Sequence, residues 1–236
     1  MKNQADCTFY TSQTPTLLEK FDENARYWIT VMTSLHGHDA AEDLVADARQ
    51  AFEDLIPELP YIGGQENHLT NSLIWSAQCL ALHRVLKAHG MTAAAAGKIL
   101  YDAILQKASE PRQPIPPSEW ISPEELMARR RQRAERSQLR EFSGDWVYTF
   151  VEGDGEAFDY GYDFIECGTR NFFQAHAAQD FLPYYCFLDY AYSEVEELGL
   201  SRSKTLAEGE TLCNHRFKQG RETERRWPPP FLKSEK

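Results

Sequence analysis

The chain has 236 residues, a formal net charge of −11 and 42% hydrophobic residues. A chain of this length folds as one large domain or as one domain with appendages, and its composition is far from that of a disordered protein. The negative charge repels phosphate backbones and anionic lipids, which argues against nucleic acid and membranes as partners. No stretch approaches the roughly 18 apolar residues that span a bilayer, and the N-terminus lacks the apolar core of a signal peptide. We therefore expect a cytoplasmic protein.

The cysteines are widely spaced, odd in number and form no CxxC pair. This pattern indicates reduced thiols rather than a disulfide framework or a zinc ribbon, and we expect no resident metal and no cofactor. The five cysteines are Cys7, Cys79, Cys167, Cys186 and Cys213.

Apolar periodicity predicts four helices before residue 110. The first runs from Thr16 to about Leu35, and the second from His38 or Asp39 to Leu55, where prolines follow. The third, residues 66–89, is apolar on nearly every side, as is typical of a buried central helix, and Gly90 ends it. Thr92 caps the fourth, residues 93–108.

The proline-rich residues 111–120 predict an extended connector, and Ser122 with Pro123 opens a further helix that reaches about residue 139. Arginines at helical spacing follow along it. In an acidic protein without interleaved aromatic residues, this stripe favours a salt-bridge face over a ligand or nucleic-acid surface. The stripe consists of Arg129, Arg133, Arg136 and Arg140.

The final third predicts strands at 145–151 and 162–167, helices at 169–178 and 182–198, and a second hairpin that pairs 204–208 with 211–217. The residues from 227 onward read as a loosely ordered tail. The expected fold is α+β, a mostly helical body with a small antiparallel β-sheet formed by the C-terminal third. We expect a single domain over residues 1–236, helical at 13–140 and strand-containing at 145–220.

No familiar catalytic signature is present, so function has to be sought in constellations of residues. Cys186 and Asp189 lie three residues apart on a predicted helix, beside an apolar stripe, so a thiol and a carboxylate can point at one spot. The carboxylate would serve as a general base and a thiolate as a nucleophile. Two plainer interpretations remain open: core packing for the thiol and a solvated face for Asp189.

A second constellation lies on the last predicted strand. Strand alternation places Cys213, His215 and Phe217 on one face, and Asn214 and Arg216 on the other. A thiol and an imidazole on one face suit a nucleophile with its base, or two metal ligands. The alternatives are a hydrogen-bonded sheet histidine, and an arginine that pairs with a surface acid instead of a substrate carboxylate.

The run from Tyr162 to Phe217 resembles the C-terminal half of the L-2-amino-thiazoline-4-carboxylic acid hydrolase family. The resemblance is carried by a strand ending in Cys167, the helix with Cys186 and Asp189, Gly199, the segment RSKTLAEG at 202–209, and Cys213 leading into Arg216 and Phe217. The central helix, from Asn71 to Gly90, is similar in style to the family's buried helix. The chain departs from the family pattern at Asn214 and His215, where that pattern has an acid and an aromatic residue.

The resemblance implies hydrolytic opening of a small heterocycle at an amidine-like carbon, as in conversion of 2-amino-thiazoline-4-carboxylate to a carbamoyl cysteine in cysteine metabolism. Such a carbon needs a nucleophile, a proton donor for the departing ring atom and a cation for the substrate carboxylate. The expected catalytic residues are Asp189, Cys186, Cys213 and His215. The expected substrate-binding residues are Arg216, Asn71, Thr205 and Cys167.

Two rival functions stay open at this stage. One is a metal-dependent hydrolase built on Cys186, Asp189, Cys213 and His215, although these residues lack short chelating spacing. The other is a non-catalytic helical module that binds a small molecule or a protein. The expected partner is a small heterocyclic substrate, and the sequence leaves open the exact substrate, the nucleophile and whether the chain forms a homo-oligomer.

Overall fold

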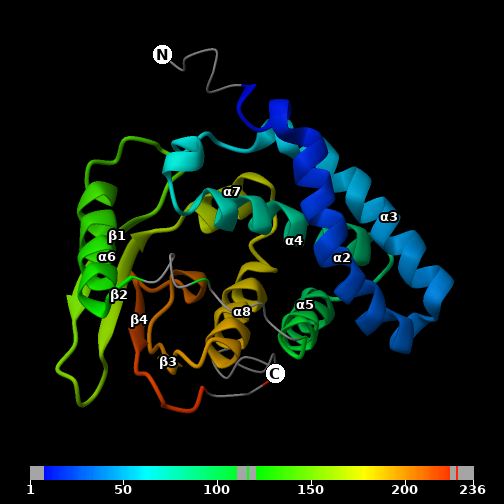
Figure 1. Cartoon of the computed structure of the whole chain (residues 1–236). Helices are drawn as coiled ribbons and strands as arrows, with labels where there is room; N and C mark the ends of the chain where they lie inside the picture. Colours follow the sequence, from blue (N-terminus) through cyan, green and yellow to red (C-terminus); the bar gives the residue numbers. More distant parts are fainter. Residues whose placement is uncertain (1–7, 111–115, 117–120, 224–226, 228–236) are drawn as a thin grey trace.

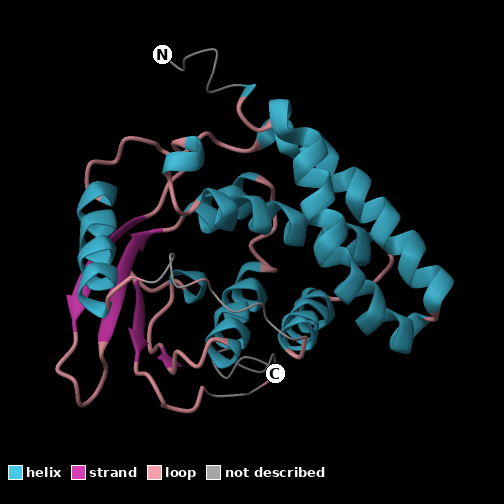
Figure 2. Cartoon of the chain, viewed as in Figure 1, coloured by secondary structure: helices cyan, strands magenta, loops and turns pink. Residues whose placement is uncertain are grey.

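The computed structural model describes residues 8–110, 116, 121–223 and 227. Within these residues, seven α-helices accompany one four-stranded antiparallel sheet, whose strands all lie within residues 147–217 (Figure 1, Figure 2). The predicted α+β class is therefore confirmed. No helix in the described ranges is long and apolar enough to cross a membrane.

Helices α2 (Thr14–His36) and α3 (His38–Leu55) form a pair at one side of the molecule (Figure 1). They are joined by Gly37, whose φ of 85° is costly for a residue with a Cβ, so the glycine allows the sharp reversal. Between them, the ring of Phe21 stacks on Phe52 at 5.5 Å and meets Trp28 edge-on at 5.1 Å. Both predicted helices are confirmed, with their apolar stripes buried in the core.

Helix α4 (Thr70–Ala88) is the central helix, and its buried face includes polar Ser76 and His83 beside four leucines. It begins later than predicted because Gly64–Glu66 forms a 3₁₀ turn. The Thr70 hydroxyl donates to the Gly64 carbonyl at 2.6 Å and fixes this turn against the helix start.

Helix α5 (Ala93–Ala108) has the predicted bounds. The Thr92 hydroxyl accepts a hydrogen bond from the Ala95 amide at 3.1 Å, which caps its first turn. Gly90, at φ 83°, ends the helix before it in the left-handed conformation, as the sequence predicted.

Helix α6 (Pro123–Ser137) is capped by Ser122, whose hydroxyl accepts from the Glu125 amide at 3.1 Å. Three of the four stripe arginines make ion pairs on an exposed face: Arg129 with Glu125 at 2.6 Å, Arg136 with Glu141 at 3.6 Å, and Arg140, which follows the helix, with Glu166. The salt-bridge interpretation is confirmed for these three arginines. The predicted connector at 111–120 lies outside the described residues apart from Pro116, and the predicted tail lies outside them apart from Trp227.

The sheet has the order β1-β2-β4-β3, with β1 (Val147–Glu152), β2 (Tyr160–Glu166), β4 (Cys213–Phe217) and β3 (Leu200–Ser201). Its register aligns Phe164 with Cys213, and Tyr162 with His215, so these residues share one face. Helix α6 packs against β1 and helix α8 against β3. The predicted alternation along β4 is confirmed, because Arg216 lies opposite Gly161 on the other face.

The second predicted hairpin is wrong. The edge partner of β4 is the two-residue strand β3, and Leu206–Glu208 forms a 3₁₀ turn instead of a strand. The Thr205 hydroxyl accepts from the Ala207 amide at 3.2 Å, and the Leu206 amide donates to Cys213 Sγ at 3.1 Å. These local bonds use the backbone donors that a strand would have paired.

Helices α7 (Gly168–Ala175) and α8 (Leu182–Val195) connect the sheet to the helical body. Three hydroxyls link α8, α4 and α7, because Ser76 Oγ lies 2.9 Å from the Tyr185 hydroxyl and 2.7 Å from Thr169 Oγ1. Helix α8 ends earlier than the predicted residue 198, since Glu197 and Gly199 adopt positive φ and turn the chain into β3. This chain of hydroxyls fixes the helix that carries Cys186 and Asp189.

Candidate functional site

A cavity of about 410 Å³ lies where α4 and α8 meet the inner face of the sheet. Its walls are mostly apolar and aromatic, with a few polar groups among them, which is the usual make-up of a small-molecule site. The lining residues are Leu69, Asn71, Ser72, Trp75, Trp146, Phe164, Cys167, Thr169, Tyr185, Cys186, Leu188, Asp189, Tyr192, Arg202, Cys213 and His215. Both predicted constellations therefore open into one cavity.

The polar centre of this cavity is a cluster of Asp189, Arg202 and His215. Asp189 Oδ2 lies 3.1 Å from Arg202 Nη1 and 3.3 Å from His215 Nε2. The second guanidinium nitrogen of Arg202 donates to the carbonyl of Cys186 at 2.9 Å, one turn earlier on α8. The cluster thus joins α8, the loop after β3, and β4.

The three side chains of this cluster differ in how far they are exposed to solvent. The side chains of Arg202 and His215 are 3% and 12% exposed, whereas that of Asp189 is 47% exposed. Asp189 Oδ1 has no hydrogen-bond partner among the described residues, while Oδ2 takes both contacts. Arg202 and His215 therefore hold Oδ2, whereas Oδ1 is open to the cavity.

Nε2 of His215 lies 3.3 Å from both Asp189 Oδ2 and Arg202 Nη1. If Nε2 carries the proton, it donates to the carboxylate; if Nδ1 carries it, Nε2 accepts from the guanidinium of Arg202. In both forms Nδ1 is buried without a partner in the described part of the chain. His215 therefore contacts the Asp189–Arg202 pair in either form and helps to position it.

The charge states follow from burial and from the neighbours. Burial opposes ionisation of Asp189, but the contact with His215 and the charge of Arg202 outweigh it and lower the pKa of the carboxyl group. Burial and the nearby Arg202 lower the pKa of His215, against the pull of Asp189. At neutral pH the cluster thus holds a carboxylate, a neutral imidazole and a guanidinium.

Two thiols of the cavity, those of Cys186 and Cys167, are protonated. Burial raises the pKa of Cys186 well above its usual value, and it raises the pKa of Cys167 to about 11. Cys167 also caps α7, where its Sγ accepts from the Arg170 amide at 3.4 Å. Cys213 accepts from the Leu206 amide and holds the 3₁₀ turn. A neutral thiol is a poor nucleophile but can donate a hydrogen bond.

Six of the eight residues predicted for the site line this cavity, and Asn71 is the one at its exposed rim. Thr205 does not line it: this residue is 1% exposed and bonds within the turn beside Cys213. Arg216 also lies outside the lining, because its guanidinium pairs with Asp163 at 2.8 Å on the outer face of the sheet.

Arg202 is a charged cavity residue that sequence reasoning left without a role. It lies in a polar loop where no periodicity indicates burial, although it belongs to the segment that carried the family resemblance. Asn214 helps to hold this loop, because its side-chain oxygen accepts from the Ser203 and Lys204 amides at 3.0 and 2.7 Å. The departure from the family pattern at position 214 therefore has a structural role beside Arg202.

The same cavity has no ready-made metal centre. Among the residues that the structure describes, no three His, Cys, Asp or Glu side chains are grouped as metal ligands.

A larger cleft of about 780 Å³ lies between α6 and the turn before α4. Three arginines of the predicted stripe, Arg133, Arg136 and Arg140, line it, and two of them are ion-paired, Arg136 with Glu141 at 3.6 Å and Arg140 with Glu166. It holds none of the eight residues predicted for the catalytic and substrate-binding site.

Comparison with known proteins adds no relative. No family model matches the chain, and neither a curated protein nor a solved structure matches it. The reading of the site therefore depends on its own geometry and on the family resemblance in the sequence.

Proposed function

We propose that this protein is a hydrolase that opens a small heterocycle at an amidine-like carbon. The observation that carries the proposal is the half-exposed Asp189 carboxylate, held by the buried Arg202 and His215 in a mostly apolar cavity. The resemblance to the L-2-amino-thiazoline-4-carboxylic acid hydrolase family supports the same chemistry, with 2-amino-thiazoline-4-carboxylate as the type of substrate.

The reaction needs one water molecule. Water adds to the amidine carbon, one ring bond to that carbon breaks, the departing ring atom takes a proton, and the carbon becomes the carbonyl of a carbamoyl group. In this scheme the open oxygen of Asp189 orients the water and accepts its proton. Arg202 and His215 act behind it as positioning residues.

Cys186 has a place in this scheme as a hydrogen-bond donor. Because burial keeps its thiol protonated, it can donate a hydrogen bond to the departing ring atom, to which Asp189 returns the proton taken from water. Asn71 at the rim contributes an amide to substrate binding. Arg216, paired on the outer face, has no part in the proposed site.

The location of the protein, the type of its substrate and its cofactor requirement belong to the same proposal. We place the protein in the cytoplasm, with a small heterocyclic compound of cysteine metabolism as its substrate, and we invoke no cofactor.

The test is turnover of a panel of small cyclic amidines, thiazolines and lactams by the purified, metal-analysed protein in water enriched in ¹⁸O. Ring-opened products with one ¹⁸O in the new carbonyl support the proposal, since the oxygen comes from water. A panel that stays intact with folded protein contradicts it. Binding without turnover would instead favour a small-molecule binding module, an alternative that the apolar lining also suits.

A further inference from the structure

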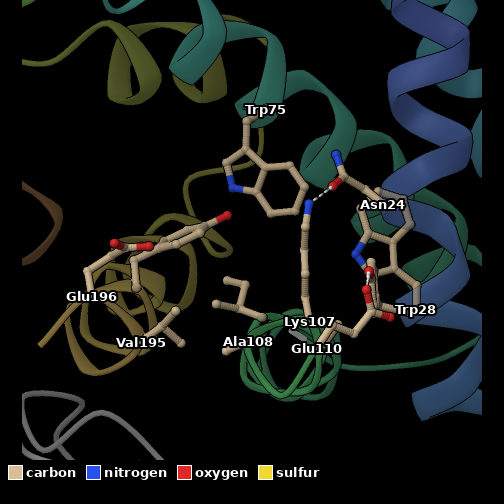
Figure 3. Close-up of a pocket in the computed structure, with 12 residues that line it drawn as sticks. Asn24, Trp28, Trp75, Lys107, Ala108, Glu110, Val195 and Glu196 are labelled. Carbon is tan, nitrogen blue, oxygen red and sulfur yellow. Dashed lines mark hydrogen bonds between the residues drawn. The ribbon is translucent and has the colours of Figure 1, made fainter. Parts of the chain in front are cut away.

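A second cavity of about 410 Å³ lies beside the first one. It is enclosed by α2, α4, α5 and α8, and its lining is dominated by aromatic and aliphatic side chains, including Trp28, Trp75 and Ile104 (Figure 3). Two charged side chains of the lining are already paired, because Lys107 donates to the Asn24 side chain at 3.2 Å and the Glu110 carboxylate accepts from the Tyr27 hydroxyl at 2.8 Å (Figure 3). Its size and lining suit an apolar group the size of one ring.

The two cavities share a wall. Trp75 and Tyr192 line both of them, with ring centroids 6.5 Å apart and planes inclined by 77°. Tyr192 projects from α8 one turn after Asp189, so the wall stands next to the proposed catalytic carboxylate. A group attached to a molecule held at Asp189 needs to pass only these two rings to reach the second cavity.

The contact between Trp75 and Tyr192, which forms this wall, is weak. The indole nitrogen of Trp75 is buried and has no hydrogen-bond partner among the described residues, so no bond ties it to the Tyr192 hydroxyl. Tyr192 is 40% exposed although it is a large aromatic residue. An edge contact between two rings holds them together only weakly, and a partly exposed side chain changes rotamer readily. Tyr192 can therefore turn aside when a ligand enters.

We propose that the substrate spans both cavities. Its reactive ring lies against Asp189, and an apolar, ring-sized substituent on that ring occupies the cavity between Trp28 and Tyr192. This inference rests on the proposed function and narrows its substrate class to substituted rather than minimal cyclic amidines.

The test compares 2-amino-thiazoline-4-carboxylate with its 2-benzylamino derivative by calorimetry and by turnover. The derivative should bind about tenfold more tightly or better, because the benzyl group leaves water. Ala108→Trp, which adds a large ring to the lining of the second cavity at a half-buried position, should abolish this advantage and leave affinity for the unsubstituted compound unchanged. Ala108→Leu should give a partial loss and keeps the test valid if the tryptophan variant misfolds.

The matched control is Ala40→Trp, at an exposed position of α3 outside both cavities, which should keep the advantage. A derivative that binds no more tightly than the parent compound, or an advantage that survives in Ala108→Trp, overturns the inference. Turnover of the parent without a benzyl advantage removes the inference but keeps the proposed function. The expected affinities without any turnover contradict the proposed function and, with it, the inference that the spanning molecule is a substrate. Absence of binding by both compounds also removes both.

Discussion

Two arginine–aspartate pairs in the C-terminal third use the same chemical groups in opposite settings. Arg202 and Asp189 meet inside the cavity, where the arginine side chain is 3% exposed. Arg216 and Asp163 meet on the outer face of the sheet, with side chains 22% and 28% exposed. The comparison shows that residue type does not identify a site, because burial and the free oxygen of one partner make the difference.

The largest expected effect is the difference in free energy of unfolding between variants of the two arginines. Arg202→Met leaves Asp189 without its cation in a partly buried place, and since that carboxylate still reaches the cavity we expect a loss of about 3 kcal/mol, the lower end for a broken buried pair. Arg216→Met should cost about 1 kcal/mol or less, as for a pair near the surface. Urea unfolding of both variants measures this. Equal losses would contradict the contrast.

Burial of a histidine in the helical body governs how the free energy of unfolding changes with pH. His83 on α4 stacks flat on Phe181, its side chain is 2% exposed, and burial lowers its pKa from 6.5 to about 4. Since the folded protein prefers the neutral imidazole, this stabilisation is complete above pH 6.5 and is lost as the pH falls toward 4. The gap between 6.5 and about 4 corresponds to on the order of 3 kcal/mol.

The measurement is the free energy of unfolding from pH 7 to pH 4 for the wild type and His83→Gln. The variant should show a flatter profile in this window, while His38→Gln, at an exposed position on α3, should keep the wild-type slope. An unchanged slope in His83→Gln would mean that this imidazole is not held neutral by burial. His215, whose pKa is also lowered, should contribute in the same direction.

The smallest effect is expected for the thiols. Because burial keeps Cys186 protonated, Cys186→Ser, which retains a hydrogen-bond donor, should lower kcat by roughly tenfold or less. A nucleophilic cysteine would lose activity almost completely in this variant. Cys213→Ser should keep kcat within a few-fold, because Cys213 holds the turn at Leu206.

Local signals account for most of the fold. The cap at Thr92 and the glycine at position 90 are short-range features, so the ends of α5 and α4 could be predicted from neighbouring residues alone. The wrong hairpin has the opposite origin. Strand β3 has two residues, too few to show alternation, and its pairing with β4 spans a turn whose shape depends on the Cys213 sulfur.

The site residues likewise divide into those that local patterns predict and those that depend on tertiary packing. Helical spacing placed Cys186 with Asp189, and strand alternation placed Cys213 with His215, so each pair was visible in its own segment. Their meeting in one cavity, and the burial of Arg202 between them, depend on how α8 packs against the sheet. No local pattern contains that information, which is why the sequence led to Arg216 and left Arg202 without a role.

The central claim is that the open oxygen of Asp189 performs the chemistry. The most direct test measures turnover and binding of 2-amino-thiazoline-4-carboxylate for the wild type, Asp189→Asn and the matched outer-face variant Asp163→Asn. We predict that Asp189→Asn still binds the compound but loses about 10²- to 10⁴-fold in kcat, and that Asp163→Asn turns over at the wild-type rate. Full turnover by Asp189→Asn would contradict the account.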